Sequence, residues 1–400
     1  MERKAANKKP TPTKAKAKVT RAKTTKPLVA KVKAKEQEKT IKRPMDFVIL
    51  ITVIILVCFG IVMVYDSSFY YAEIHFSNSM YYFNKQLVGA ILGFAAMIFF
   101  SYFDYRYLKR FKTIAMLVSI AMLVAVLFVG SKLGASRWFD VAGISVQPSE
   151  IAKFALILFL ADSIAKNRRM GTFKYGIVPY LLLIGVVCGL IILQPNFSMV
   201  VNLCLLVFVM LFVGGAKGRH LSLLAGGGVA AGAALMIIAP YRMKRFTIFL
   251  DPFKDPLGDG FQLVQSLYAV GAGGLFGVGL GNGHQKYLYL LYAESDFIFS
   301  IIVEELGLIG AVVVLVVFAV LIYRGVKVAL TCPDMFGTLL ATGIIATIAI
   351  QVAIHVAVVT GSIPPTGLTL PFISAGSSSL IMCMASIGIL LNISKHTTKV

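Results

Sequence analysis

The sequence is poor in charged residues and in the motifs that build metal sites. Only 14% of its 400 residues are charged, whereas 58% are hydrophobic, and the mean hydropathy is +0.82. The five cysteines form no CxxC pair and the five histidines no HExxH motif, so nothing argues for zinc. A soluble domain of this size could not hide so much apolar surface from water. The composition therefore predicts an integral membrane protein.

Acidic residues are scarcer than basic ones, 18 against 39, and the excess of bases is concentrated at the N-terminus. Residues 1–44 hold 16 Lys or Arg against three Glu and contain no apolar run. This composition predicts a disordered, solvated tail. A basic tail beside a first span holds the cytoplasmic side and contacts anionic lipid. A nucleic-acid arm is the alternative, and a cleavable signal peptide is not expected because the following apolar run is too long.

Long apolar runs account for the composition. A helix of about 20 residues crosses roughly 30 Å of hydrocarbon, and ten stretches of the chain approach that length. They lie near residues 47–65, 86–103, 113–130, 148–165, 175–193, 197–215, 221–240, 296–323, 336–359 and 369–393. The sequence therefore predicts an all-α integral membrane protein with about ten transmembrane helices within residues 45–395.

The distribution of Lys and Arg between these stretches predicts the orientation. Each segment on the side of the N-terminus carries Lys or Arg, namely 104–112, 166–174, 216–220, 324–335 and the C-terminal residues. Such a bias is typical of cytoplasmic loops. We therefore expect both termini in the cytoplasm and the long loop 241–295 outside. A loop of that length is more often functional than a simple connection.

Polar residues open the fourth apolar stretch, where they would be costly if they faced lipid. Gln147, Ser149 and Glu150 stand at its start. Lys153 follows Glu150 by three residues, so the two share a helical face and can pair. They could form the polar wall of an outward cavity, or an interface salt bridge that only anchors the span.

Arg137 and Trp138 place the only tryptophan of the chain beside a guanidinium, shortly before the fourth stretch. We expect this pair to belong to the same outward cavity. The alternative is an interfacial tryptophan of the kind that is enriched at membrane surfaces.

The long loop 241–295 groups charges of both signs. Three bases are followed by three carboxylates, namely Arg242, Lys244, Arg245, Asp251, Asp255 and Asp259. This pattern suits a substrate with an anionic lipid head group and a hydroxyl to be deprotonated; a solvated, proline-broken loop is the alternative. The glycine-rich stretch 271–283 lacks the preceding strand and the Lys-Ser/Thr of a P-loop. We expect it to be a flexible, close-packed re-entrant segment.

Further carboxylates lie at the eighth apolar stretch. Glu294 and Asp296 stand at its start, and Glu304 and Glu305 lie two to three turns deeper. Carboxylates at such a depth are expected to face the interior of the helix bundle, because lipid cannot solvate them.

These stretches together resemble the SEDS family (shape, elongation, division and sporulation). The matching segments are "ASRWFD" with "QPSEIAKF", "RFTIFLDPFKDPLGDGFQLVQSLYAVGAGGLFGVGLGNGHQKYLYL", "ESDFIFSIIVEELGLIG" and "TGLTLPFIS", in family order and spread over about 45–395. The segments "MVYDSS" and "QKYLYL" and the basic tail are more similar to the division branch (FtsW) and its sporulation relative than to the elongation branch (RodA).

The resemblance implies a glycosyltransferase that polymerises peptidoglycan from lipid II on the outer face of the cytoplasmic membrane. It would join the growing glycan, carried on undecaprenyl pyrophosphate, to the 4-hydroxyl of an incoming lipid II. The key acid of the family falls on Asp255, in the second Asp-Pro pair of the long loop. The resemblance also implies a divalent cation (Mg²⁺ or Mn²⁺), for which Asp255 is a candidate ligand, and no organic cofactor. The implied partners are a class B penicillin-binding protein and other division proteins.

Polar residues of the matching segments are the candidate substrate-binding residues. They are Arg137, Trp138, Gln147, Ser149, Glu150, Lys153, Arg245, Gln262, Gln265, Ser266, Glu294, Asp296, Glu304 and Ser374. The chain departs from the family pattern at Tyr292–Ala293, His355 and Gly376–Ser379, and none of these changes affects Asp255.

Two other classes of function remain open, a lipid II flippase or transporter and a noncatalytic division scaffold. Buried carboxylates and outward loops also suit a transport path. A transporter needs polar groups towards both faces, whereas here the inner loops are basic and the polar motifs gather outside. The distribution favours chemistry on the outer face.

Overall fold

The computed structural model describes residues 44–128, 137–141, 144–238 and 240–397. All of them belong to the compact unit Lys42–Val400. The predicted basic tail lies outside the described residues apart from Pro44.

Helices make up nearly all of the described chain. In chain order the elements are α2 (Phe47–Phe76), α3 (Tyr81–Tyr102), the 3-10 turn η1 (Tyr105–Tyr107), α4 (Leu108–Phe128), β1 (Phe139–Val141), β2 (Ile144–Val146), α5 (Pro148–Lys166), α6 (Phe173–Gly176), α7 (Val178–Leu193), α8 (Phe197–Val213), α9 (Gly218–Ile238), α10 (Pro240–Leu250), the 3-10 turn η2 (Pro252–Lys254), α11 (Phe261–Gly273), α12 (Ile298–Thr331), α13 (Met335–Val359) and α14 (Ser377–Ser394). The two strands form an antiparallel pair with Phe139 opposite Val146.

Six of the described helical segments are long and apolar enough to cross a membrane, namely α2, α3, η1 with α4, α12, α13 and α14. The apolar helices α7 and α8 are shorter, with 16 and 17 residues. Each of the ten predicted apolar stretches overlaps one of these eight helices or one of α5 and α9. The chain is therefore an α-helical, multi-pass membrane protein.

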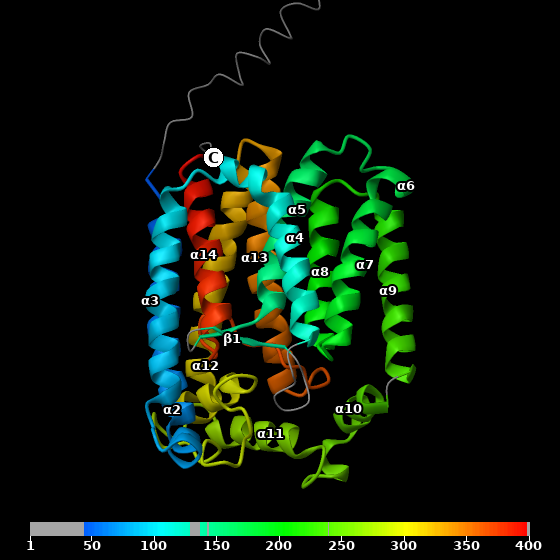
Figure 1. Cartoon of the computed structure of the whole chain (residues 1–400). Coiled ribbons are helices and arrows are strands. Elements are labelled where there is room, and N and C mark those ends of the chain that lie inside the picture. The colour runs from blue at the N-terminus through cyan, green and yellow to red at the C-terminus, as the bar shows by residue number, and fades with distance from the viewer. Residues whose placement is uncertain (1–43, 129–136, 142–143, 239, 398–400) are drawn as a thin grey trace, which may run out of the picture. The chain divides into compact units, whose positions relative to one another are not determined.

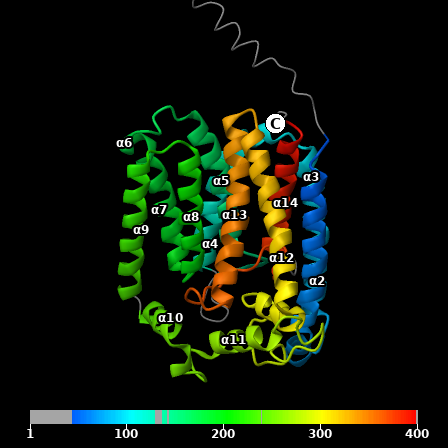
Figure 2. The same cartoon turned by 180° about the vertical axis from the view of Figure 1, so that it is seen from behind.

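The long helices run side by side, and α10, η2 and α11 lie together at one end of them (Figures 1 and 2). We call this end the loop end. The C-terminus lies at the opposite end (Figure 1). Most of the long loop 241–295, which contains Asp255, therefore lies at the loop end.

Small residues allow α3 and α14 to approach closely. A Cβ on Gly93 would lie 2.5 Å from Met384 Sδ, and one on Gly388 would meet the backbone of Met97. Close backbone approach through small residues is a main source of helix association in membranes, where no hydrophobic force acts between helices.

An ion pair closes the end of the bundle opposite the loop end. Asp46 caps the N-terminus of α2 by accepting the N–H groups of Val48 and Ile49 at 3.1 and 3.3 Å. The same carboxylate accepts two hydrogen bonds from Arg324 of α12, at 2.6 and 3.0 Å. The contact fixes α2 against α12 at this end.

The helix α12 is broken at Gly307, whose φ of 68° and ψ of −171° are not helical. Segment 274–279 replaces the missing helical hydrogen bonds. The N–H groups of Val278 and Gly279 donate to the carbonyls of Glu304 and Glu305, both at 3.0 Å. In return, the carbonyls of 274 and 275 accept the N–H groups of 308 and 309 at 2.9 and 3.2 Å. A broken helix at membrane depth needs such protein partners, because lipid offers none.

The contact between segment 274–279 and α12 leaves no room for a side chain at Gly277. This residue has a φ of 79°, and a Cβ would meet the backbone of Glu305. We expect Gly277→Ala to lower the free energy of unfolding by roughly 2 kcal/mol or more, from overpacking and backbone strain together. Thermal unfolding in detergent measures the effect.

Gly271 is the matched control, because it lies in α11 and nothing stands within 4 Å of its Cβ position. Gly271→Ala should be neutral or slightly stabilising, as alanine favours a helix. Equal melting temperatures for the two variants would contradict the close packing.

Candidate functional site

Asp255 lies in a tight turn of the loop end, and its side chain is exposed. Its carboxylate accepts the N–H groups of Gly258 and Asp259 at 3.1 and 3.2 Å. A Cβ at Gly258 would collide with the same carboxylate. Because a carboxylate has about four lone-pair sites, these two bonds orient Asp255 and leave acceptor capacity facing solvent.

One basic residue of α10 contacts this turn. Lys244 forms an ion pair with Asp259, and this hydrogen bond raises the pKa of Lys244, with a smaller contribution from the charge of Asp255. Arg245, one residue further, donates to the carbonyl of Pro365 at 3.3 Å. Of the six charges that the sequence groups in this loop, the structure shows Lys244 and Asp259 in contact, whereas Arg245 contacts another loop.

Asp296 lies near candidate residues of two other segments, Arg137 and Arg245. Burial raises its pKa to about 6, although the charges of Arg245 and Arg137 act to lower it. Arg137 Nε donates to the carbonyl of Gln194 at 3.0 Å, and its Nη2 donates to Pro195. The structure therefore brings Arg137, Arg245 and Asp296 into one electrostatic neighbourhood. Trp138 is half-exposed.

Glu294 is a buried carboxylate at the loop end. Burial raises its pKa from 4.5 to about 7, and the charge of Asp296 adds to the effect. Its backbone carbonyl accepts the N–H of Ala375 at 2.8 Å. Ser374 donates to the carbonyl of Ser295 at 2.6 Å and accepts the N–H of Leu370 at 2.8 Å. The hydroxyl of Ser374 therefore holds two loops together.

The predicted pairing of Glu150 with Lys153 is confirmed. Lys153 Nζ lies 2.7 Å from Glu150 Oε2 and 3.5 Å from Gln351 Oε1 of α13, and both charged side chains are buried. Ser379 of α14 donates to Glu150 at 3.4 Å. The adjoining cavity of about 20 Å³ has room for about one water. The pair therefore joins α5, α13 and α14, and lines only a narrow space.

The remaining predicted residues divide between internal and half-exposed positions. Ser266 of α11 is buried, with its Oγ 2.8 Å from Ser300 Oγ and 3.1 Å from the carbonyl of Val359. Gln262 and Gln265 are half-buried. Ser149 is buried, whereas Gln147 is half-buried and its N–H lies 3.4 Å from Ser378 Oγ.

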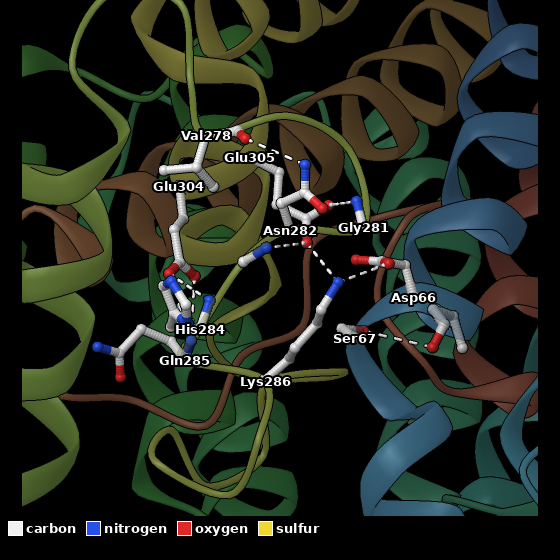
Figure 3. A network of polar contacts seen from close by, with 12 residues as sticks. Asp66, Ser67, Val278, Gly281, Asn282, His284, Gln285, Lys286, Glu304 and Glu305 are labelled. Atoms are coloured by element: carbon white, nitrogen blue, oxygen red, sulfur yellow. Dashed lines mark hydrogen bonds and ion pairs between the residues drawn. The ribbon is translucent and has the colours of Figure 1, made fainter.

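Glu304 and Glu305 face the interior of the bundle, as predicted from their depth, and both are buried (Figure 3). Glu304 accepts the N–H groups of His284 and Gln285 at 2.8 and 3.3 Å. Glu305 accepts those of Gly281 and Gly283 at 3.0 and 3.1 Å. These backbone bonds fasten the loop to the broken helix.

Lys286 completes this network and was not selected from the sequence, and neither was its partner Asp66. Its Nζ lies 2.6 Å from Glu305 Oε1 and 2.8 Å from Asp66 Oδ1 of α2 (Figure 3). The available signal was Asp66 itself, since a carboxylate within an apolar helix requires a partner. The partner could not be read from the sequence, because it lies 220 residues away.

Comparison with known proteins identifies the family. The family model described as "Cell cycle protein", which groups FtsW, RodA and SpoVE, matches residues 46–399. The chain belongs to this family. The membership confirms the resemblance to SEDS proteins that the sequence segments indicated, and it covers the whole described bundle.

Relatives of the FtsW/RodA/SpoVE family match along most of their length. Stage V sporulation protein E of Bacillus subtilis is 42% identical, over 90% of this chain and 99% of the relative. A probable peptidoglycan glycosyltransferase FtsW of Trichlorobacter lovleyi is 41% identical, over 87% and 93%. The FtsW of Bacillus subtilis is 36% identical, over 89% and 92%.

Solved structures of the family share the fold. One, described as "Structural coordination of polymerization and crosslinking by a peptidoglycan synthase complex", has a TM-score of 0.72 at 30% identity and covers 88% of this chain and 97% of its own. The rod shape determining protein RodA of Thermus thermophilus has a TM-score of 0.66 at 27% identity, over 89% and 98%.

The burial of Lys153 predicts a large effect of its removal. Lys153→Ala leaves the carboxylate of Glu150 buried without its ion pair, which should lower the free energy of unfolding by about 3–5 kcal/mol. Lys166→Ala is the control. Lys166 is exposed, and its partner Asp162 also pairs with Lys112 at 2.5 Å, so the effect should stay below about 1 kcal/mol. Equal, mild shifts of the melting temperature in the two variants would show that the pair of Lys153 and Glu150 only anchors the span at the interface.

The raised pKa of Glu294 predicts a pH-dependent stability. A carboxyl with a higher pKa in the folded state than in the unfolded state destabilises the fold as pH rises from 4.5 towards 7. Glu294→Gln should therefore match the wild type near pH 4.5 and exceed it at pH 8 by about 3 kcal/mol, the equivalent of this pKa difference. Thermal unfolding across this pH range measures the gap. A gap that stays constant with pH would show that Glu294 ionises normally.

Proposed function

We propose that this protein is a peptidoglycan glycosyltransferase that polymerises lipid II into glycan strands on the outer face of the cytoplasmic membrane during cell division. Its membership of the FtsW/RodA/SpoVE family carries the proposal, together with FtsW relatives that are named probable peptidoglycan glycosyltransferases. The exposed acid Asp255 and the bases Lys244 and Arg245 of the adjoining helix support it, because they suit an anionic, hydroxyl-bearing substrate.

The proposed orientation has ten spans, both termini in the cytoplasm and the loop end outside. The basic side chains between the helices support it. Lys112 and Lys166 share Asp162, Arg324 contacts Asp46, and Lys395 donates to the carbonyl of Ser101. These bases belong to the start of α4 and the ends of α5, α12 and α14, which lie opposite the loop end (Figure 1). Basic residues at one end of the spans are typical of the cytoplasmic side.

In the proposed reaction the 4-hydroxyl of an incoming lipid II attacks the anomeric carbon of the growing glycan. A new glycosidic bond forms, the bond to undecaprenyl pyrophosphate breaks, and the hydroxyl proton passes to the carboxylate of Asp255. Asp255 suits this role because its two backbone hydrogen bonds orient it while its side chain stays exposed. Lys244 and Arg245 lie on the adjoining helix, where they would attract the pyrophosphate.

A divalent cation is part of the proposal. Among the described residues, no three His, Cys, Asp or Glu side chains gather as a metal site. Mg²⁺ commonly binds one or two carboxylates together with substrate phosphates and water, so the single carboxylate of Asp255 would suffice as its protein ligand, as the alternative to acting as the base. When bound, the cation would neutralise charge on the pyrophosphate leaving group.

The proposed partner is a class B penicillin-binding protein, which would crosslink the new glycan strands; other division proteins would complete the assembly. The similarity to a chain of a peptidoglycan synthase complex supports a partnered enzyme. The proposal gives the tail 1–44 no part in this chemistry.

Asp255→Asn should abolish polymerisation, with a loss of roughly 10²–10⁴-fold, because both proposed roles of the carboxylate need its charge. The test incubates purified protein and its penicillin-binding partner with labelled lipid II and Mg²⁺ or Mn²⁺, and then resolves the polymer on a gel.

Neighbouring acids serve as controls for this substitution. Asp259→Asn should change the rate little, because it removes one exposed ion pair with Lys244, and Asp251→Asn should have a mild to intermediate effect. Normal polymer from a folded Asp255→Asn variant would remove Asp255 from the mechanism and direct attention to Glu294, Asp296 or Glu304.

A further inference from the structure

Lys286 is the one basic residue that the described part of segment 274–297 sends into the helix bundle. Its side chain is fully buried, between Glu305 of α12 and Asp66 of α2 (Figure 3). The ammonium also lies 5.6 Å from the ring centroid of Phe69 on α2. A buried ammonium is costly unless it is paired, so the carboxylates of Glu305 and Asp66 stabilise Lys286 in this position.

The two ion pairs of Lys286 attach the loop to different helices, α12 through Glu305 and α2 through Asp66. Glu305 is already fastened to the loop by the N–H groups of Gly281 and Gly283, so its contact with Lys286 only strengthens an existing attachment. The contact with Asp66 is different. Among the described residues it is the ion pair that joins the loop to α2. Without it, the loop would stay attached to α12, and the ring contacts of Tyr287 with Phe69 and Tyr70 would remain to hold it against α2.

Segment 274–297 lies between the two parts of the candidate site. On one side it continues from α11, whose preceding turn holds Asp255 through the bond from Gly260 N–H to the Asp255 carbonyl at 3.1 Å. On the other side it ends at Glu294 and Asp296, directly before α12. A shift of this segment would therefore change the relation of Asp255 to the acids at the start of α12.

We propose that Lys286 and Asp66 are positioning residues, which hold segment 274–297 against α2 so that the two parts of the site keep the spacing needed for turnover. The inference rests on the proposed function. Neither residue touches substrate in this account. They act through the loop, because a misplacement of about 1 Å at a reacting centre can cost on the order of a hundredfold in rate.

Asp66→Asn separates positioning from folding. It removes the ion pair to α2, but Lys286 remains neutralised by Glu305 at 2.6 Å, so no charge is stranded. We expect the kcat for lipid II polymerisation to fall by roughly ten- to a hundredfold, with KM and melting temperature unchanged. Glu73→Gln is the control, since it removes an exposed carboxylate from the same helix and should leave all three values unchanged.

Hydrogen exchange supplies a second readout that needs no activity. In Asp66→Asn, the amides of Tyr287 and Leu290, in the turn that carries Lys286, should exchange faster than in the wild type. Those of Gly281 and Gly283, which Glu305 holds, and those of α13 should not change. Asp66→Glu, which restores the charge, should recover part of both exchange protection and kcat.

The outcomes distinguish this inference from the proposed function. Wild-type kcat and wild-type exchange in Asp66→Asn would overturn the positioning role, and so would a kcat that falls only in step with the melting temperature. If the wild type itself made no polymer, the proposed function would fail, and unchanged loop exchange would then decide against the tie to α2.

Discussion

Glu304 and Glu305 are neighbours in sequence, buried inside the bundle, and placed just before the break of α12 at Gly307. Two carboxylates and a set of broken backbone hydrogen bonds cannot be left in an apolar interior. Segment 274–286 meets both demands at once, with backbone N–H groups for the carboxylates and for the carbonyls of residues 304 and 305. The long loop is therefore fixed to the membrane helices by the requirement to satisfy buried polar groups.

The same requirement explains the contrast between the buried and exposed charges. Within the bundle, Lys153 is paired with Glu150, Lys286 with Glu305, and Asp162 with two lysines. Asp255 instead lies exposed in a turn, oriented by two N–H groups. Paired charges make a rigid frame, whereas Asp255 keeps free acceptor capacity, which its proposed role as proton acceptor requires.

Much of the fold could be predicted, because apolar runs report directly on membrane helices. The errors lie where polar residues continue a helix or apolar residues leave one. The first stretch was predicted to end near residue 65, but α2 continues to Phe76 through Asp66, which Lys286 neutralises. The last stretch was predicted from residue 369, but α14 starts at Ser377, because 370–376 forms the loop that contacts Glu294 and Ser295.

The site was predicted in part, because local spacing reveals only local partners. The pair Glu150–Lys153 follows from three-residue spacing on a helix, and the close packing of the glycine-rich stretch is confirmed at Gly273 and Gly277. The contact between Lys286 and Asp66 joins distant parts of the chain, and no spacing pattern in the sequence predicts it. The internal bonds of Ser266 and Ser374 likewise depend on which helices and loops meet.

The central claim is that this family member builds polymer at the membrane surface and does not carry lipid II across it. The most direct measurement reconstitutes the protein with a class B penicillin-binding partner in vesicles that contain fluorescent lipid II. Polymer on a gel and transbilayer movement of lipid II are then followed in the same sample. The account predicts protein-dependent polymer and a translocation rate equal to that of protein-free vesicles. Accelerated translocation without polymer would contradict it.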